Sequence, residues 1–178
     1  MICRLQVHTI ESKVTSTSIV FQLRGLDITN VEKGALGLGR TDPCFEISKT
    51  YRCPAKGTTL RTVVYRSEVV KNHLNPFWDK AALNMEAFCD GNLDMPLRIQ
   101  LLDWGETGNR QVGYVDTTPR FLLGAVTTEG NADRSRALDI HRGNGDNVRS
   151  TDKVGILVVV EATLVENSLL DSLTIIVT

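Results

Sequence analysis

Short runs in which apolar and polar residues alternate recur along the chain. The two clearest series of alternating apolar positions are Ile19, Phe21, Leu23 and Leu97, Ile99, Leu101. Because successive side chains of a β-strand point to opposite faces, each series is expected to face a core. Further strands are predicted at residues 45–49, 60–69, 137–141 and 155–165, which are rich in β-branched or aromatic residues. Clusters of Gly, Asn, Asp and Pro separate the runs, a pattern typical of an antiparallel sandwich or barrel.

One segment conflicts with this pattern. Residues 81–88 (AALNMEAF) are good helix formers, so propensity alone predicts a helix there. The segment lies between two clear strands, and strand formation depends strongly on tertiary context. We therefore predict a strand at this position as well.

Composition and charge narrow the functional classes. The chain has 178 residues, of which 42% are hydrophobic and 23% charged, as expected for one globular domain with a real core. Its formal net charge of −1 argues against nucleic-acid binding. The four cysteines form no CxxC pair, which favours reduced thiols and a cytoplasmic location. The start has no long apolar stretch, and the most apolar run, 155–165, is far shorter than a membrane-spanning helix of about 20 residues.

Three motifs occur in an order that resembles a known family. Residues 39–47 (GRTDPCFEI) resemble the Ser-Asp-Pro-Tyr/Phe signature at the first calcium loop of C2 domains. Residues 65–78 (YRSEVVKNHLNPFW) resemble the copine pattern that ends in Leu-Asn-Pro-x-Trp. Residues 101–104 (LLDW), followed by 112–114 (VGY), resemble the third calcium loop and the strand after it. The chain therefore resembles a single copine-like C2 domain.

The resemblance implies an eight-stranded antiparallel Greek-key β-sandwich of the C2 type. We expect this domain to span residues 1–165. Residues 166–178 lie outside the resemblance and form an apolar C-terminal tail. The tail is expected to pair with a sheet edge of its own domain as an extra strand, to pair with a second copy of the chain in a homodimer, or to begin a following domain.

The calcium site that the resemblance implies is depleted of charge. Asp42 and Asp103 occupy two matching positions, but Asn30 and Gly105 stand where the family usually has aspartates, and the third loop offers neutral groups such as Asn109. Calcium binds through six to eight oxygens, and carboxylate charge sets its affinity. Asp42, Asp103, Asn30 and Asn109 are thus expected to form a weak Ca²⁺ site or none.

The first loop is also longer than usual, and its extra part (31–39) is apolar and rich in glycine. We expect Leu36, Leu38 and Trp104 to contact a membrane, since the amphipathic ring of tryptophan favours the headgroup region. The alternative is that both leucines fold back onto the sandwich to cover apolar surface.

A basic sheet face is a second candidate lipid contact. Lys49, Arg66 and Lys71, with Arg52 and Arg61, are the nearest cations, but a useful headgroup site needs several of them clustered. The alternative is that these charges are merely solvated.

No arrangement of catalytic groups is visible. His8, His73 and His141 have no metal-ligand spacing, and no nucleophile motif accompanies them. Two hypotheses follow for a non-enzymatic module. The first is a cytoplasmic, peripheral membrane domain that binds anionic phospholipid, with weak Ca²⁺ dependence or none. The second is a Ca²⁺-independent scaffold that binds a protein partner, as a monomer or a homodimer.

Overall fold

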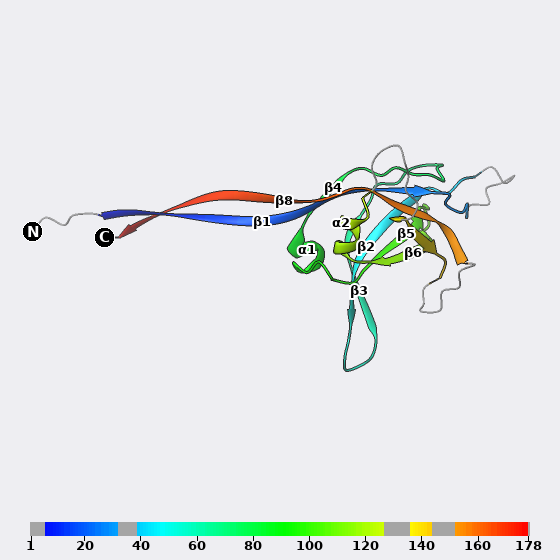
Figure 1. Ribbon diagram of the computed structural model, residues 1–178, viewed down its shortest axis with the longest axis horizontal. Helices are drawn as coiled ribbons and strands as arrows, with labels where there is room; N and C mark the ends of the chain where they lie inside the picture. Colours follow the sequence, from blue (N-terminus) through cyan, green and yellow to red (C-terminus); the bar gives the residue numbers. More distant parts are fainter. Residues whose placement is uncertain (1–5, 32–38, 127–135, 144–151, 178) are drawn as a thin grey trace, which may run out of the picture.

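The computed structural model describes residues 6–31, 39–126, 136–143 and 152–177. Within these ranges, eight strands and two short helices follow one another (Figure 1). Their bounds are β1 Gln6–Leu26, β2 Pro43–Arg52, β3 Thr59–Arg66, β4 Ala81–Asn84, α1 Met85–Cys89, β5 Leu97–Asp103, β6 Arg110–Thr117, α2 Pro119–Gly124, β7 Leu138–His141 and β8 Lys153–Val177. The strands pair antiparallel, which confirms the predicted all-β fold.

The strands form two layers that face each other. The hydrogen-bonded order is β3-β2-β5-β6-β7-β8-β1-β4, and β6 joins β7 through only one residue pair, Tyr114↔His141. This narrow junction divides the order into β3-β2-β5-β6 and β7-β8-β1-β4. Aromatic rings join the two layers, since Phe21 of β1 lies edge-on to Tyr65 of β3 with ring centroids 5.5 Å apart.

Gly113 allows the close approach at this junction. A Cβ atom at this position would lie 2.7 Å from the backbone oxygen of His141 and equally near a methyl carbon of Val154. Contacts this short do not occur for real Cβ atoms, so any other residue would push β7 away from β6. The glycine in the predicted 112–114 motif is therefore a packing requirement.

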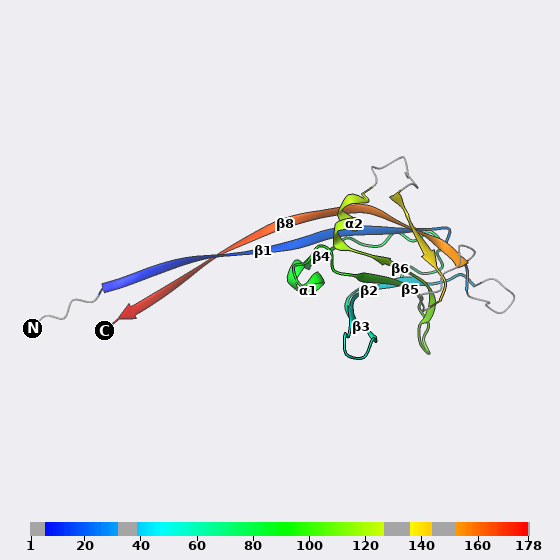
Figure 2. The same ribbon diagram turned by 60° about the horizontal axis from the view of Figure 1, so that its bottom comes forward.

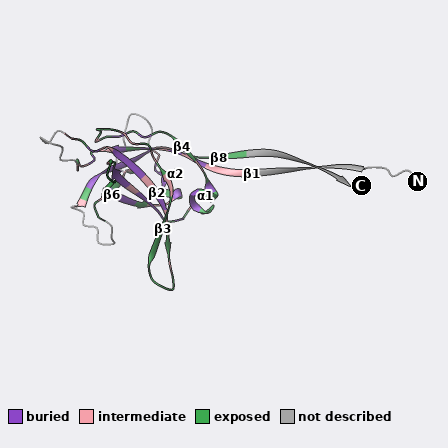
Figure 3. Ribbon diagram, turned by 180° about the vertical axis from the view of Figure 1, so that it is seen from behind, coloured by how far each residue is buried: buried purple, intermediate pink, exposed green. Residues whose placement is uncertain are grey.

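The core lies between the layers and contains the predicted alternating residues. Both series, Ile19, Phe21, Leu23 and Leu97, Ile99, Leu101, are buried. Trp78 is fully buried, its ring lies 4.9 Å from that of Phe45, and its Nε1 donates to the carbonyl oxygen of Pro43 at 3.3 Å. Burial is concentrated in the sandwich, while the hairpin of β2 and β3 is exposed toward its tip (Figure 3).

The strand predicted at residues 81–88 is confirmed for residues 81–84 and wrong for residues 85–88, which are helical. Strand β4 pairs with β1 and ends at Asn84, where helix α1 begins. The side-chain oxygen of Asn84 accepts from the backbone N–H of Glu86 at 2.9 Å, which caps the helix. Met85, Phe88 and Cys89 then turn one buried face toward the core.

The longest ladder joins β1 to β8, from Gln6↔Val177 to Leu26↔Ile156. Beyond Ser18, where β4 stops pairing, the two strands leave the sandwich as a ribbon with Gln6 and Val177 at its far end (Figures 1 and 2). We define the ribbon as residues 6–17 of β1 and 166–177 of β8. The apolar tail thus lengthens β8 and forms no separate strand. The domain boundary at residue 165 stays a prediction.

Replacing Trp78 tests how much the core depends on this ring. We expect Trp78→Ala to lower the free energy of unfolding by about 3–5 kcal/mol, since it removes a fully buried aromatic side chain. The matched control is Phe77→Ala at the adjacent residue, which is 51% exposed and should cost less than about 1 kcal/mol. Urea unfolding followed by circular dichroism measures both, and equal losses would contradict this account of the core.

Candidate functional site

Four connections meet at the end of the sandwich opposite the ribbon, and we call their described parts the loop crown. They are residues 27–31 with 39–42, 67–80, 104–109, and 142–143 with 152. Backbone hydrogen bonds tie them together: Ile28 N–H donates to Leu74 O at 2.9 Å, and Trp104 N–H donates to Asp42 O at 2.9 Å. Side chains on these loops are therefore held at fixed positions relative to one another.

Asp42 and Asp103 lie side by side at the adjoining ends of β2 and β5. The Oδ1 atom of Asp103 accepts from the backbone N–H of Asp42 at 2.8 Å, and Asp103 is only 6% exposed. The Oδ1 atom of Asp42 in turn accepts from the backbone N–H of Asn72 at 2.7 Å. One oxygen of each carboxylate is thus already used to fix a loop.

Asn30 and Asn109 contribute differently. The side-chain oxygen of Asn30 accepts from Thr41 twice, from its N–H at 3.1 Å and its hydroxyl at 3.2 Å, while its amide nitrogen donates to Gly39 O. An amide oxygen has two lone pairs, so these two bonds occupy it. Asn109 is exposed in the 104–109 loop. Among the described residues, no three His, Cys, Asp or Glu side chains lie close enough to hold a metal ion.

Trp104 and Lys71 lie together on the outside of the crown. Trp104 is 38% exposed, and the Nζ atom of Lys71 lies 5.8 Å from the centre of its ring. A cation at this distance from an indole face is attracted by the ring. Sequence reasoning assigned these two residues to different surfaces because only the fold brings the 67–80 segment to the 104–109 loop. Leu36 and Leu38 lie outside the described residues.

Two further residues of the predicted basic face, Lys49 on β2 and Arg66 on β3, form ion pairs. Lys49 donates to Asp90 Oδ1 at 2.5 Å, and its side chain is only 12% exposed. This hydrogen bond, with a second one from Tyr51, holds the pKa of Asp90 below its usual range. Arg66 forms an ion pair with Glu46 at 2.8 Å, although its own side chain is well exposed. Lys49 and Arg66 are therefore each partly neutralised by a neighbouring carboxylate, and the basic face formed by Lys49, Arg66 and Lys71 stays a prediction.

Burial and nearby carboxylates determine the protonation state of Cys44, a cysteine of β2 next to the crown. Burial, followed by the charges of Glu46 and Asp103, raises the pKa of the Cys44 thiol to about 11. The thiol is therefore protonated at neutral pH and is a poor nucleophile. Cys44, Cys53 and Cys89 are all free.

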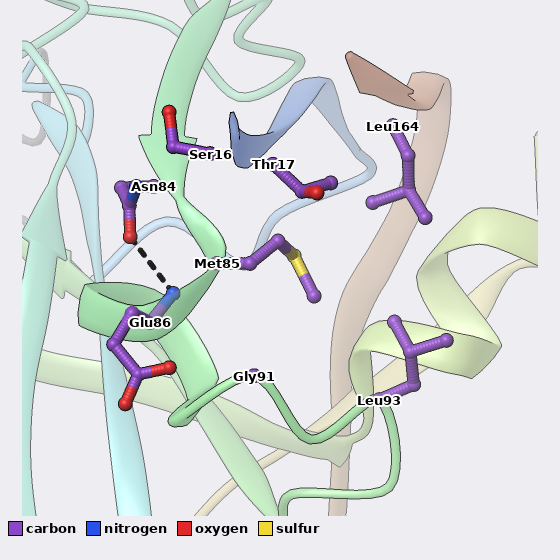
Figure 4. A pocket seen from close by; sticks show the side chains of 8 residues that line it. All are labelled: Ser16, Thr17, Asn84, Met85, Glu86, Gly91, Leu93 and Leu164. Atoms are coloured by element: carbon purple, nitrogen blue, oxygen red, sulfur yellow. Dashed lines mark hydrogen bonds between the residues drawn. The ribbon is translucent and has the colours of Figure 1, made fainter. Parts of the chain in front are cut away.

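A cavity of about 410 Å³ lies at the opposite end, where the ribbon leaves the sandwich. Its lining includes Ser16 and Thr17 of β1, Met85 and Glu86 of α1, Leu93 and Leu164 (Figure 4). No pattern in the sequence indicated this cavity, because its walls come from four separate segments without a shared motif.

Comparison with known proteins addresses the fold. No protein-family model matches the chain. The solved structure named BON1-C2B matches with a TM-score of 0.59 at 22% identity, over 84% of this chain and 92% of its own. A C2 domain of plant Extended Synaptotagmin 1 matches with a TM-score of 0.50 at 15% identity, over 86% and 95% of the two chains. The chain therefore has an all-β fold of the C2 type, as its three motifs predict.

Proposed function

We propose that this protein is a C2-type module that binds anionic phospholipid membranes through its loop crown. The observation that carries the proposal is the exposed Trp104 ring with the Lys71 ammonium beside it. An indole ring is favoured at the depth of lipid headgroups, and a nearby lysine gains about 1 kcal/mol from an anionic surface. The C2-type fold supports a membrane-binding or protein-binding module.

Calcium has a minor role in this proposal. Asp42 and Asp103 each use one oxygen to fix a loop, and the oxygen of Asn30 is occupied by Thr41. A Ca²⁺ ion would have to be held by the remaining oxygens of two carboxylates with help from neutral groups such as Asn109. So few charges support only weak binding.

Several finer assignments belong to the same proposal. The likeness of residues 65–78 to copines supports a copine-like subtype, and the absence of catalytic motifs in the sequence supports a binding module over an enzyme. A peripheral attachment from the cytoplasm fits this assignment. No helix among the described residues is long and apolar enough to cross a membrane.

Vesicle co-sedimentation tests the contact. We expect the protein to pellet with phosphatidylserine-containing vesicles both in EGTA and in millimolar Ca²⁺. Lys71→Glu and Trp104→Ser should each weaken partitioning by roughly tenfold, through charge reversal and the loss of an interfacial ring respectively. Phe121→Ser, which replaces a similarly exposed aromatic residue on α2, is the matched control for Trp104 and should partition normally.

Charge reversal on the sheet separates the two candidate surfaces. Lys49→Glu with Arg66→Glu should leave partitioning within about twofold of the wild type, because neither residue belongs to the crown. Selective loss in this variant would move the lipid site to the sheet. If the wild type never pellets, the lipid proposal fails and a protein-binding scaffold becomes the better interpretation.

Titration calorimetry measures the calcium contribution separately. We expect millimolar affinity at best, and Asp103→Asn should abolish any measurable heat since it removes one of only two carboxylates at the site. Circular dichroism must show that this variant is folded, because Asp103 also fixes Asp42. A sub-micromolar isotherm for the wild type would contradict the weak-site account.

A further inference from the structure

In the part of the chain that the structure describes, one long strand edge of the β1–β8 ribbon has no partner strand. Among the described residues, β4 is the strand that pairs with β1 on the side away from β8, and it reaches only from Phe21 to Ser18. The edge of β1 from Gln6 to Thr17 therefore extends for about 40 Å, at roughly 3.3 Å per residue. A two-stranded ribbon alone is marginal in water, and a third strand stabilises such a structure.

We propose that a second copy of this chain pairs with this edge, antiparallel and around a two-fold axis at Ser12, to give a four-stranded sheet in the order β8-β1-β1-β8. A two-fold interface uses the same surface of both copies, so the edge must be complementary to itself. This inference is independent of the proposed membrane contact.

Backbone geometry limits the registers that such a pair can adopt. Along a strand edge every second residue points its N–H and C=O outward, and directly opposed residues in an antiparallel ladder are of the same kind. In a symmetric pair of two such edges, one residue must therefore lie directly opposite the same residue of the partner. The two-fold axis then lies midway between these two copies, and an axis 'at' a residue has this meaning below. The number of candidate registers is small.

Charge then selects among these registers. The described edge carries two opposite charges, Glu11 and Lys13, separated by one residue. An axis at Glu11 or at Lys13 would oppose two like charges. An axis at Ser12 opposes Glu11 to the partner's Lys13 and, by symmetry, Lys13 to the partner's Glu11. Opposite charges directly across a ladder stabilise the sheet, and like charges destabilise it.

The apolar residues agree with the same register. An axis at Ser12 opposes Ile10 to the partner's Val14, while β8 already opposes Leu173 to Ile10 and Leu169 to Val14. Directly opposed residues share a face of the sheet. On one face of the four-stranded sheet, two rows of directly opposed residues would then form, one on either side of the axis. Each row would contain four apolar residues: Leu173 and Ile10 of one copy, and Val14 and Leu169 of the other.

The length of the free edge fits as well. With the axis at Ser12, the ladder runs from Val7 opposite the partner's Thr17 to Thr17 opposite the partner's Val7. It stops at the residue before Ser18, where β4 takes over the edge. The 410 Å³ cavity lies at this point, beside Ser16 and Thr17 (Figure 4).

The edge of β8 is a poorer choice for self-pairing. From Val160 to Val177 its charged residues are Glu161, Glu166 and Asp171, all acidic, and Glu161 pairs with Lys80 at 2.5 Å. Two copies of this edge can bring no opposite charges together. The sequence predicted a homodimer that forms through the C-terminal tail. In the dimer proposed here β1 makes the contact, and the tail, as part of β8, stabilises the sheet.

Charge exchange tests the register in the full chain. Sedimentation equilibrium of the wild type should show a monomer–dimer equilibrium. Glu11→Lys and Lys13→Glu should each weaken dimerisation by at least about tenfold, because each opposes like charges twice across the axis. The double variant, Glu11→Lys with Lys13→Glu, should restore wild-type dimerisation. The control is Glu166→Lys, which makes the same charge change on β8 and should leave the dimer intact.

A disulfide provides a second test that does not depend on charge. In a Cys3→Ser, Cys53→Ser background, Ser12→Cys should form an intermolecular disulfide under mild oxidation, because directly opposed Cα atoms lie about 4.5–5.5 Å apart. Thr15→Cys is the matched control, since the two copies of residue 15 would lie roughly 20 Å apart. The proposal is overturned if the wild type stays monomeric at high concentration. It is also overturned if neither charge reversal weakens the dimer and cysteines at residues 12 and 15 cross-link equally.

Discussion

The pairing of β1 with β8 joins the first and last strands of the described residues, and it determines which end of the sandwich carries the loops. The ladder runs from Gln6↔Val177 through the sandwich to Leu26↔Ile156. Near Leu26 the chain must enter a loop that leads to β2 in the other layer. The ladder thereby places the loop crown at one end of the molecule and the free ribbon at the other (Figure 2). The proposed contact with lipid and the proposed contact between copies therefore lie on separate surfaces.

The crown shows how the same polar groups can serve either structure or ion binding. Backbone N–H groups at loop ends need acceptors, and here Asp42, Asp103 and Asn30 supply them. A carboxylate that accepts such a bond can still ligate calcium with its other oxygen, whereas the amide oxygen of Asn30 has no lone pair left and carries no charge. The loops are therefore held in place without an ion, which is why the proposed membrane contact rests on Trp104 and Lys71.

Sequence reasoning predicted the fold from two kinds of signal. Alternation identified the buried faces of β1 and β5, and the three motifs placed the C2-type order of strands around them. It did not place Lys71, because residues 67–80 are not a regular strand and their path depends on contacts such as Ile28 N–H with Leu74 O. It also missed the helix at Met85, since the capping role of Asn84 becomes clear only once β4 is seen to end there. The ribbon was half predicted. The apolar tail indicated a strand in need of cover, but its partner, residues 6–17, is too rich in Ser and Thr to stand out.

The two proposals, taken together, constrain how a dimer would meet a membrane. In each copy β1 runs from the ribbon tip toward the crown, and the two β1 strands would lie antiparallel. The sandwiches must then lie at opposite ends of the shared sheet, with their Ser18 residues about 40 Å apart at ~3.3 Å per residue. Each crown lies beyond its own sandwich, so the two crowns face away from each other. Such a dimer cannot place both crowns on one flat bilayer and gains no avidity there, but it has the geometry to hold two separate surfaces at once.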